Sequence, residues 1–95
     1  MPAYLIAEHR IHDAGRFEAY RSAVAPMIAR YGGRYLTKPG SHAVLDGAWQ
    51  PSRVVIVEFP DMATLKRWYD SPEYQPLIEL RRSSATDVLI ALDGA

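Results

Sequence analysis

Residues 53–74, RVVIVEFPDMATLKRWYDSPEY, carry the strongest structural signal in the chain. The β-branched run at positions 54–57 is typical of a strand that is buried on both faces. Pro60 has no backbone N–H with which to continue a strand. Asp61 can then cap a helix whose apolar side includes Trp68. The stretch therefore predicts a central strand that leads directly into an amphipathic helix.

The composition is that of a small globular protein without a dominant charge. Its 95 residues are 48% hydrophobic, and 11 basic side chains balance 11 acidic ones. This length predicts one domain over residues 1–95, and the even charge argues against nucleic-acid binding, which needs a basic surface. The absence of cysteine excludes disulfides and thiolate chemistry. The N-terminus, MPAYLIAEHR, reaches charged residues after a short apolar run, so we expect no signal peptide, no membrane span and a cytoplasmic location.

The first part of the chain predicts a strand followed by a helix. Residues 3–11 fit a strand that is apolar on both faces at its start. Asp13 can cap the next helix, in which apolar side chains recur three and four positions apart until Gly32-Gly33 ends it. Pro26 removes one hydrogen bond inside this helix and is expected to kink it.

The remaining segments complete an alternation of strands and helices. Residues 34–38 predict a polar edge strand, which residues 42–45 resume after a bend, and residues 46–52 predict a hairpin connection. Ser71 is expected to cap a short helix, with the proline that follows it at the first helical position. Residues 87–92 predict the last strand.

Two parts of the chain repeat one strand-and-helix pattern. Residues 6–8 (IAE) match residues 56–58 (IVE), and bulky apolar side chains follow Asp13 at the spacings at which they follow Asp61. Two such units predict a ferredoxin-like sheet whose first and third strands are central and parallel, with a right-handed crossover and both helices on one face. The other face would be apolar and bare. We therefore expect a second copy of the chain to cover it and close a dimeric α/β barrel.

A set of short motifs spans most of the chain: Tyr31-Gly32-Gly33-Arg34, Asp46-Gly47 followed by Trp49, Glu58-Phe59-Pro60, and Trp68-Tyr69 before Ser71-Pro72-Glu73-Tyr74. Together they resemble the domain of unknown function 1330 family, within the dimeric α/β barrel superfamily. The resemblance implies an α+β, ferredoxin-like βαββαβ monomer with a four-stranded antiparallel sheet and helices on one face, and a homodimer. It implies no reaction, although superfamily relatives include cofactor-free monooxygenases, lactone isomerases and haem enzymes.

The sharpest candidates for chemistry are the carboxylates of Glu8 and Glu58. If the two strand-and-helix units superpose, these side chains lie at matching depth on neighbouring strands about 4.8 Å apart and face the same way. Two buried carboxylates cannot both ionise cheaply there, so either one keeps a proton and acts as a general acid or base, or an arginine bridges them. The simpler interpretation is a structural Glu–Arg pair that uses one of several arginines: Arg34, Arg53, Arg81 or Arg82.

Several other side chains could line a ligand pocket. Trp68 and Tyr69 fit the apolar stripe of a helix, which favours a place in the core, and they could also wall a pocket. Trp49 falls in a predicted loop where no periodicity accounts for it, so it either plugs the end of the sheet or lines the mouth of a pocket. Arg53 or Arg34 is the group expected to orient an anionic ligand.

The histidines give little sign of a metal or haem site. His9 and His12 are three positions apart, and such residues on a strand point to opposite faces. His42 is distant, and neither long predicted helix carries a histidine. We therefore expect no metal and no cofactor.

The sequence supports two classes of function. The first is a small cofactor-independent enzyme that moves a proton on a small, partly apolar organic molecule, with Glu58, aided by Glu8, as acid or base. The second is a homodimer without catalysis that binds a small ligand or another protein. The state of Glu58 separates them, because a carboxyl group beside a cavity favours catalysis and a tight arginine pair favours a structural role.

Overall fold

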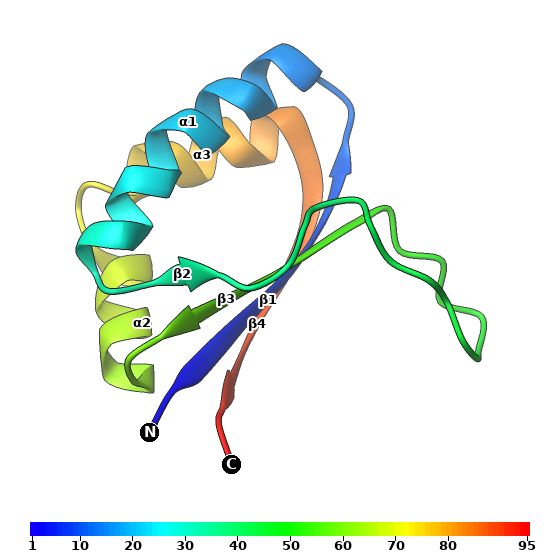
Figure 1. The fold of residues 1–95 in the computed structure, drawn as a ribbon. Coiled ribbons are helices and arrows are strands. Elements are labelled where there is room, and N and C mark those ends of the chain that lie inside the picture. The colour runs from blue at the N-terminus through cyan, green and yellow to red at the C-terminus, as the bar shows by residue number, and fades with distance from the viewer.

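The computed structural model describes all 95 residues, which fold as one sheet with helices on one side (Figure 1). The elements in chain order are β1 (Ala3–Ile11), α1 (Ala14–Arg30), β2 (Arg34–Tyr35), β3 (Arg53–Phe59), α2 (Met62–Asp70), α3 (Gln75–Ser84) and β4 (Ala85–Asp93). The four-stranded sheet has the order β2-β3-β1-β4, and every neighbouring pair is antiparallel. This is the α+β, ferredoxin-like architecture that the sequence predicts.

The relation between the two central strands differs from the prediction. β1 and β3 are neighbours, as expected, but they run antiparallel, with Ala3 opposite Phe59 and His9 opposite Arg53. The repeat of two strand-and-helix units suggested parallel strands, yet similar units can enter one sheet in opposite directions. The register of these strands decides which side chains meet, so this correction changes the candidate site.

Local capping signals predict the two helix starts correctly. The carboxylate of Asp13 accepts a hydrogen bond from the Arg16 N–H at the start of α1, and Asp61 accepts one from the Thr64 N–H at the start of α2. Both caps satisfy backbone donors that the first helical turn leaves free. Helix α1 continues past Pro26 to Arg30 without interruption.

Two predicted elements are wrong. Ser71 does not cap a helix: its hydroxyl donates to the Trp68 carbonyl at the end of α2, and α3 begins only at Gln75. Residues 42–45 form no strand, because the chain leaves the sheet soon after β2 and makes a long loop over residues 36–52 (Figure 1). Gly40 and Gly47 both have positive φ angles in this loop, which turns the backbone away from an extended course.

The hydrophobic core fills the space between the helices and one face of the sheet. Alternate residues of β1 and β3 are buried in it. Helices α1, α2 and α3 lie on that side of the sheet (Figure 1). The core residues are Ala3, Leu5, Phe17, Tyr20, Val24, Met27, Ile28, Val57, Phe59, Leu65, Trp68, Tyr74, Ile78 and Ala85. The predicted location of Trp68 in the core is therefore confirmed.

The opposite face of the sheet carries no helix and is apolar. Val88, Ile90 and Leu92 of β4 are 59%, 50% and 45% exposed on this face. Tyr4 and Ile6 of β1 lie beside them and are only half-buried. We call these five residues the open face. The structure thus has the uncovered apolar surface that the two-sided pattern of the strands predicts.

Candidate active site

Three polar residues form a row across the sheet on its helix-covered side. His9 of β1 lies directly opposite Arg53 of β3 and opposite Asp87 of β4. His9 follows Leu5 and Ala7 on the buried face of β1, so its ring points toward the helices. Directly opposed residues of antiparallel strands have Cβ atoms about 5 Å apart, so the register brings these side chains within reach of one another.

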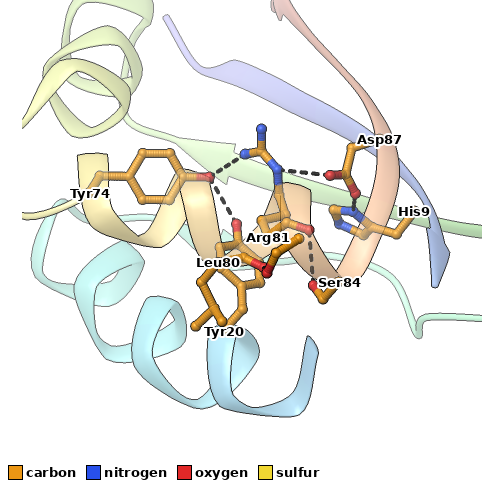
Figure 2. Close-up of polar contacts among 8 residues, drawn as sticks. His9, Tyr20, Tyr74, Leu80, Arg81, Ser84 and Asp87 are labelled. Atoms are coloured by element: carbon orange, nitrogen blue, oxygen red, sulfur yellow. Dashed lines mark hydrogen bonds and ion pairs between the residues drawn. The ribbon is translucent and has the colours of Figure 1, made fainter. Parts of the chain in front are cut away.

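The His9 ring is held in one orientation by a buried hydrogen bond to a carboxylate (Figure 2). Its Nδ1 forms a hydrogen bond with one carboxylate oxygen of Asp87. The other carboxylate oxygen accepts a hydrogen bond of 3.0 Å from Nε of Arg81, and each of these two side chains is only 3% exposed. Nε2 of His9 has no partner within the chain. The Asp87 contact therefore fixes one ring nitrogen and leaves the other available.

The hydrogen bonds continue from Arg81 into the helix layer (Figure 2). We call the linked side chains of His9, Asp87, Arg81, Tyr74 and Tyr20 the polar chain. Nη1 of Arg81 donates to the Tyr74 hydroxyl at 2.7 Å, and that hydroxyl lies 2.8 Å from the Tyr20 hydroxyl. Burial raises the pKa of Tyr20 well above its ordinary value, and the neighbouring Tyr74 adds to the shift. Burial also raises the pKa of Tyr74. Both hydroxyls therefore stay protonated at neutral pH and can act as hydrogen-bond donors.

A cavity of about 50 Å³ lies between α1 and the sheet, and His9 is part of its wall. The cavity is lined mainly by apolar side chains of α1, β1 and β3, with Trp68 of α2 and Leu89 of β4. Its exposed lining residues are Arg21, Tyr35 and Pro39, which mark its mouth at the β2 edge. β2 has only two residues, so the sheet edge beside Arg53 is left open and the cavity reaches solvent there.

Two cationic or ionisable groups flank one aromatic ring in this cavity. The His9 ring meets the Phe17 ring edge-on with centroids 4.9 Å apart. The guanidinium carbon of Arg53 lies 5.5 Å from the centroid of the same ring. An apolar cavity with a few convergent polar groups is typical of a small-molecule site.

Trp68 lines the cavity and carries a buried hydrogen-bond donor without a partner. Its side chain is 1% exposed, and its indole N–H is buried without a hydrogen-bond acceptor. A buried donor without a partner costs stability. Its place in the cavity lining agrees with the pocket wall that the sequence suggested for Trp68.

The two candidate carboxylates are not brought together. Glu8 pairs in register with Val54, whereas Glu58 pairs with Tyr4. The two glutamates share the helix-free side of the sheet but lie four residues apart along the strands, which is about 13 Å. The expected matching depth was wrong because it assumed parallel strands.

Each glutamate is instead engaged with an arginine. Nε of Arg34 donates to Oε1 of Glu58 at 2.8 Å. Nη2 of Arg10 lies 3.0 Å from Oε2 of Glu8, which also accepts the Ser52 N–H at 3.1 Å. Neither glutamate lines the cavity beneath α1.

The remaining predicted site residues are divided between the two faces. Arg53 and Trp68 line the cavity beneath α1. Tyr69 packs edge-on against Trp68, with ring centroids 6.0 Å apart, and lies outside that cavity. Trp49 is 59% exposed on the long loop and lies over the open face with Ile6.

Two other features, a metal-binding group of side chains and a membrane-spanning helix, are not found in this structure. The chain has no group of three or more histidine, aspartate or glutamate side chains arranged to hold a metal ion. None of its helices combines the length and the apolarity needed to cross a bilayer.

The family follows from the comparison with known proteins. The model of the family described as domain of unknown function DUF1330 matches residues 2–95, which is nearly the whole chain. The chain belongs to the DUF1330 family. The resemblance drawn from its sequence motifs is therefore confirmed. No curated protein matches the chain.

Solved structures similar to this DUF1330 chain share its fold at low sequence identity. RPA0582 of Rhodopseudomonas palustris, of unknown function, is 21% identical with a TM-score of 0.80, over 99% of this chain and 82% of that one. SnoaB of Streptomyces nogalater, a cofactor-independent oxygenase, is 18% identical with a TM-score of 0.69, over 99% and 93% of the two chains. A dimeric ferredoxin-like protein of unknown function from Jannaschia is 13% identical with a TM-score of 0.68, over 99% and 100%.

Sequence reasoning missed the most organised polar cluster of this DUF1330 chain. It considered His9 as a metal ligand or as an exposed or hydrogen-bonded side chain, and it did not identify Asp87 as a partner. One signal was available: His9 continues the buried alternation of Leu5 and Ala7, so its ring had to be buried and hydrogen-bonded. The identity of its partner depended on the register of β1 against β4.

Proposed function

We propose that this chain forms a homodimer that catalyses proton transfer on a small, partly apolar organic molecule without a cofactor. The observation that carries the proposal is the buried His9 ring in the cavity wall, with Nδ1 held by Asp87 and Nε2 unpartnered. In this arrangement a neutral His9 carries its proton on Nδ1 and presents Nε2 as a base. Histidine is the side chain most often used for general acid–base catalysis.

The polar chain behind His9 supplies positioning. Arg81 holds Asp87, and Asp87 holds the imidazole, so the ring does not have to be oriented when a ligand arrives. When Nε2 accepts a proton from carbon, the carboxylate of Asp87 stabilises the imidazolium that forms. Phe17 and Val24 of α1 contribute buried apolar wall beside the ring, which lowers the local dielectric and strengthens each of these electrostatic interactions.

The second copy is expected to cover the open face, away from the cavity. A monomer seldom exposes a large contiguous apolar surface, and a two-fold pair of sheets buries such a surface on both chains at once. The similar Jannaschia protein is described as dimeric, which supports this assembly. SnoaB, described as a cofactor-independent oxygenase, supports chemistry without a cofactor on this fold.

The test is hydrogen exchange at carbon. Wild-type protein is incubated in D2O with butanone, 2-oxobutyrate and other small enolisable carbonyl compounds, and loss of the C–H signal next to the carbonyl is followed by NMR. We expect acceleration over buffer for at least one compound. The H9Q variant should lower that acceleration about a hundredfold, whereas H12Q, which replaces an exposed histidine, should not.

Two results would contradict the proposal. One is a folded H9Q variant, checked by circular dichroism, with exchange as fast as wild type. The other is binding of these compounds without accelerated exchange, which would favour the second candidate, a ligand-binding dimer without catalysis.

The catalytic roles of Glu58 and Glu8 stay a prediction that the same assay tests. Their pairing with Arg34 and Arg10 favours a structural role. We therefore expect E58Q to retain most of the exchange activity, and a loss as large as that of H9Q would return Glu58 to the catalytic site.

A further inference from the structure

Arg53 stands apart from the other arginines that line the cavity or border its polar chain. Arg21 is paired with Glu18 through two hydrogen bonds of 3.0 and 2.8 Å, and Arg81 is paired with Asp87. Arg53 is half-buried in the cavity wall, yet it makes no ion pair and no side-chain hydrogen bond. The hydrogen bond from Arg21 lowers the pKa of Glu18 and the Arg53 charge adds to this shift, but the Glu18 carboxylate is paired with Arg21. The guanidinium of Arg53 therefore keeps its hydrogen-bond donors free in a place where a ligand would replace water.

The position of this charge is fixed by the sheet. Arg53 is the first residue of β3 and lies opposite His9, and its guanidinium rests over the ring of Phe17. A guanidinium over an aromatic face keeps its planar edge free for hydrogen bonds. That edge matches the two oxygens of a carboxylate, which arginine binds through parallel hydrogen bonds.

The shape of the cavity limits the rest of the ligand. Its volume of about 50 Å³ admits only a few non-hydrogen atoms, and its wall is mostly apolar. The open β2 edge lies on the same side as Arg53, so a charged end at Arg53 and a short apolar body would fit this site together. A larger rigid ligand would have to extend between Tyr35 and Pro39 at the mouth.

We propose that the cavity selects small carboxylates with a short apolar chain, and that Arg53 is the residue that binds the carboxylate beside His9. This inference rests on the proposed function only in using the same cavity. It adds that the ligand is an anion and that Arg53 binds the negatively charged group. Neutral carbonyl compounds of the same shape would bind more weakly, because they offer the Arg53 guanidinium no anionic oxygen.

The experiment compares two probes that differ in charge but hardly in shape, butyrate and butyramide. Each is titrated into isotope-labelled protein, and dissociation constants are taken from the backbone amide signals of residues 9, 17 and 53. We expect butyrate to bind about tenfold more tightly than butyramide, since a hydrogen bond to a charged group exceeds a neutral one by about that factor. R53Q should abolish this preference, and R53K should retain part of it.

Arg67 provides the matched control. It is exposed on α2, makes no ion pair and lies outside the cavity, so R67Q removes the same charge from elsewhere and should leave the preference unchanged. The inference is overturned if butyramide binds as tightly as butyrate, if the preference survives in folded R53Q, or if neither probe binds at 50 mM.

The outcome is separable from that of the proposed function. A preference for butyrate that depends on Arg53, together with exchange that does not depend on His9, would support the carboxylate site and overturn proton transfer. Exchange that depends on His9, with no preference for the anion, would do the reverse.

Discussion

Arg81 carries a positive charge into the interior, where its side chain is 3% exposed and its main partner is the equally buried Asp87. Removing one member of a buried ion pair leaves the other charge without compensation. We therefore expect R81M to lower the free energy of unfolding by about 3–5 kcal/mol, measured by urea denaturation.

The adjacent arginine supplies the control for this prediction. Arg82 follows on the same helix, is exposed and forms no ion pair, so R82M should change the free energy of unfolding by less than about 0.5 kcal/mol. Equal effects of the two substitutions would mean that the ion pair with Asp87 contributes nothing specific.

The paired hydroxyls of Tyr20 and Tyr74 predict how stability depends on pH. Burial raises the pKa of both side chains in the folded protein, whereas an unfolded tyrosine ionises near pH 10, an approximate reference value. Above that pH the unfolded chain releases protons that the folded chain keeps. The free energy of unfolding should therefore be unaffected by these groups below about pH 10 and fall as the pH rises above it.

Urea denaturation between pH 8 and pH 11 measures this slope. The Y20F and Y74F variants each lack one of the two groups, so their stability should fall less steeply at high pH than that of wild type. A slope in both variants equal to that of wild type would show that the buried hydroxyls do not carry the effect.

At the residue scale, the sequence predicted which residues line a pocket better than it predicted which side chains contact one another. It identified Arg53 and Trp68 as candidate pocket residues, and both line the cavity. It paired Glu8 with Glu58 because it assumed parallel strands, and it did not find the contact between His9 and Asp87. That contact joins residues 78 positions apart, so it depends on strand register, which short-range patterns do not determine.

At the scale of single elements, the turn between α1 and β2 has no room for a Cβ atom at Gly33. A Cβ atom on Gly33 would lie 2.6 Å from Cγ2 of Ile28 and 3.1 Å from Cε1 of Phe59, both buried in the core. We expect G33A to destabilise the protein by about 1–3 kcal/mol, the usual cost of overpacking, measured by thermal or urea unfolding.

Gly15 is the matched control for this substitution. It lies in the first turn of α1, and a Cβ atom there would come no closer than 3.7 Å to any neighbouring atom. Alanine is the better helix former, so G15A should stabilise the protein by about 0.4–1 kcal/mol. If G33A were as stable as G15A, the position of Gly33 would not be tightly packed against Ile28 and Phe59.

Elements with local signals were predictable, and those set by distant contacts were not. Asp13 and Asp61 cap their helices as expected, because a cap depends on residues within one turn. Ser71 has the sequence of a cap but completes the preceding helix, since its hydroxyl finds the Trp68 carbonyl. The strand predicted at residues 42–45 is absent, because this segment pairs with no strand of the sheet.

At the scale of the whole molecule, the two faces of the sheet have different proposed functions, ligand binding on one and dimer formation on the other. The helix-covered face holds the cavity and His9, while the open face remains available for a second copy. The sequence predicted this division because its strands are apolar on both sides while both helices pack on one. The alternation within β1 places His9 on the helix-covered face, but the residues that lie opposite it, Arg53 and Asp87, depended on the register of the strands.

The open face predicts a specific effect on assembly. Ile90 lies at its centre and is 50% exposed, so I90E would bury a charge against the partner and should convert the dimer to a monomer. Leu45 is 96% exposed on the long loop, and L45E should leave the dimer intact. Sedimentation velocity at micromolar concentration distinguishes these results, and a wild-type protein that sediments as a monomer would exclude the homodimer.

We propose that the cavity beneath α1 brings a ligand to His9, and NMR can observe this contact directly. The chain has three histidines, so their imidazole carbon signals can be resolved by NMR and assigned with the H12Q and H42Q variants. On addition of butanone or 2-oxobutyrate, we expect the signals of His9 to move while those of the two exposed histidines stay in place. Movement confined to His12 or His42, or none at His9 at saturating ligand, would contradict it.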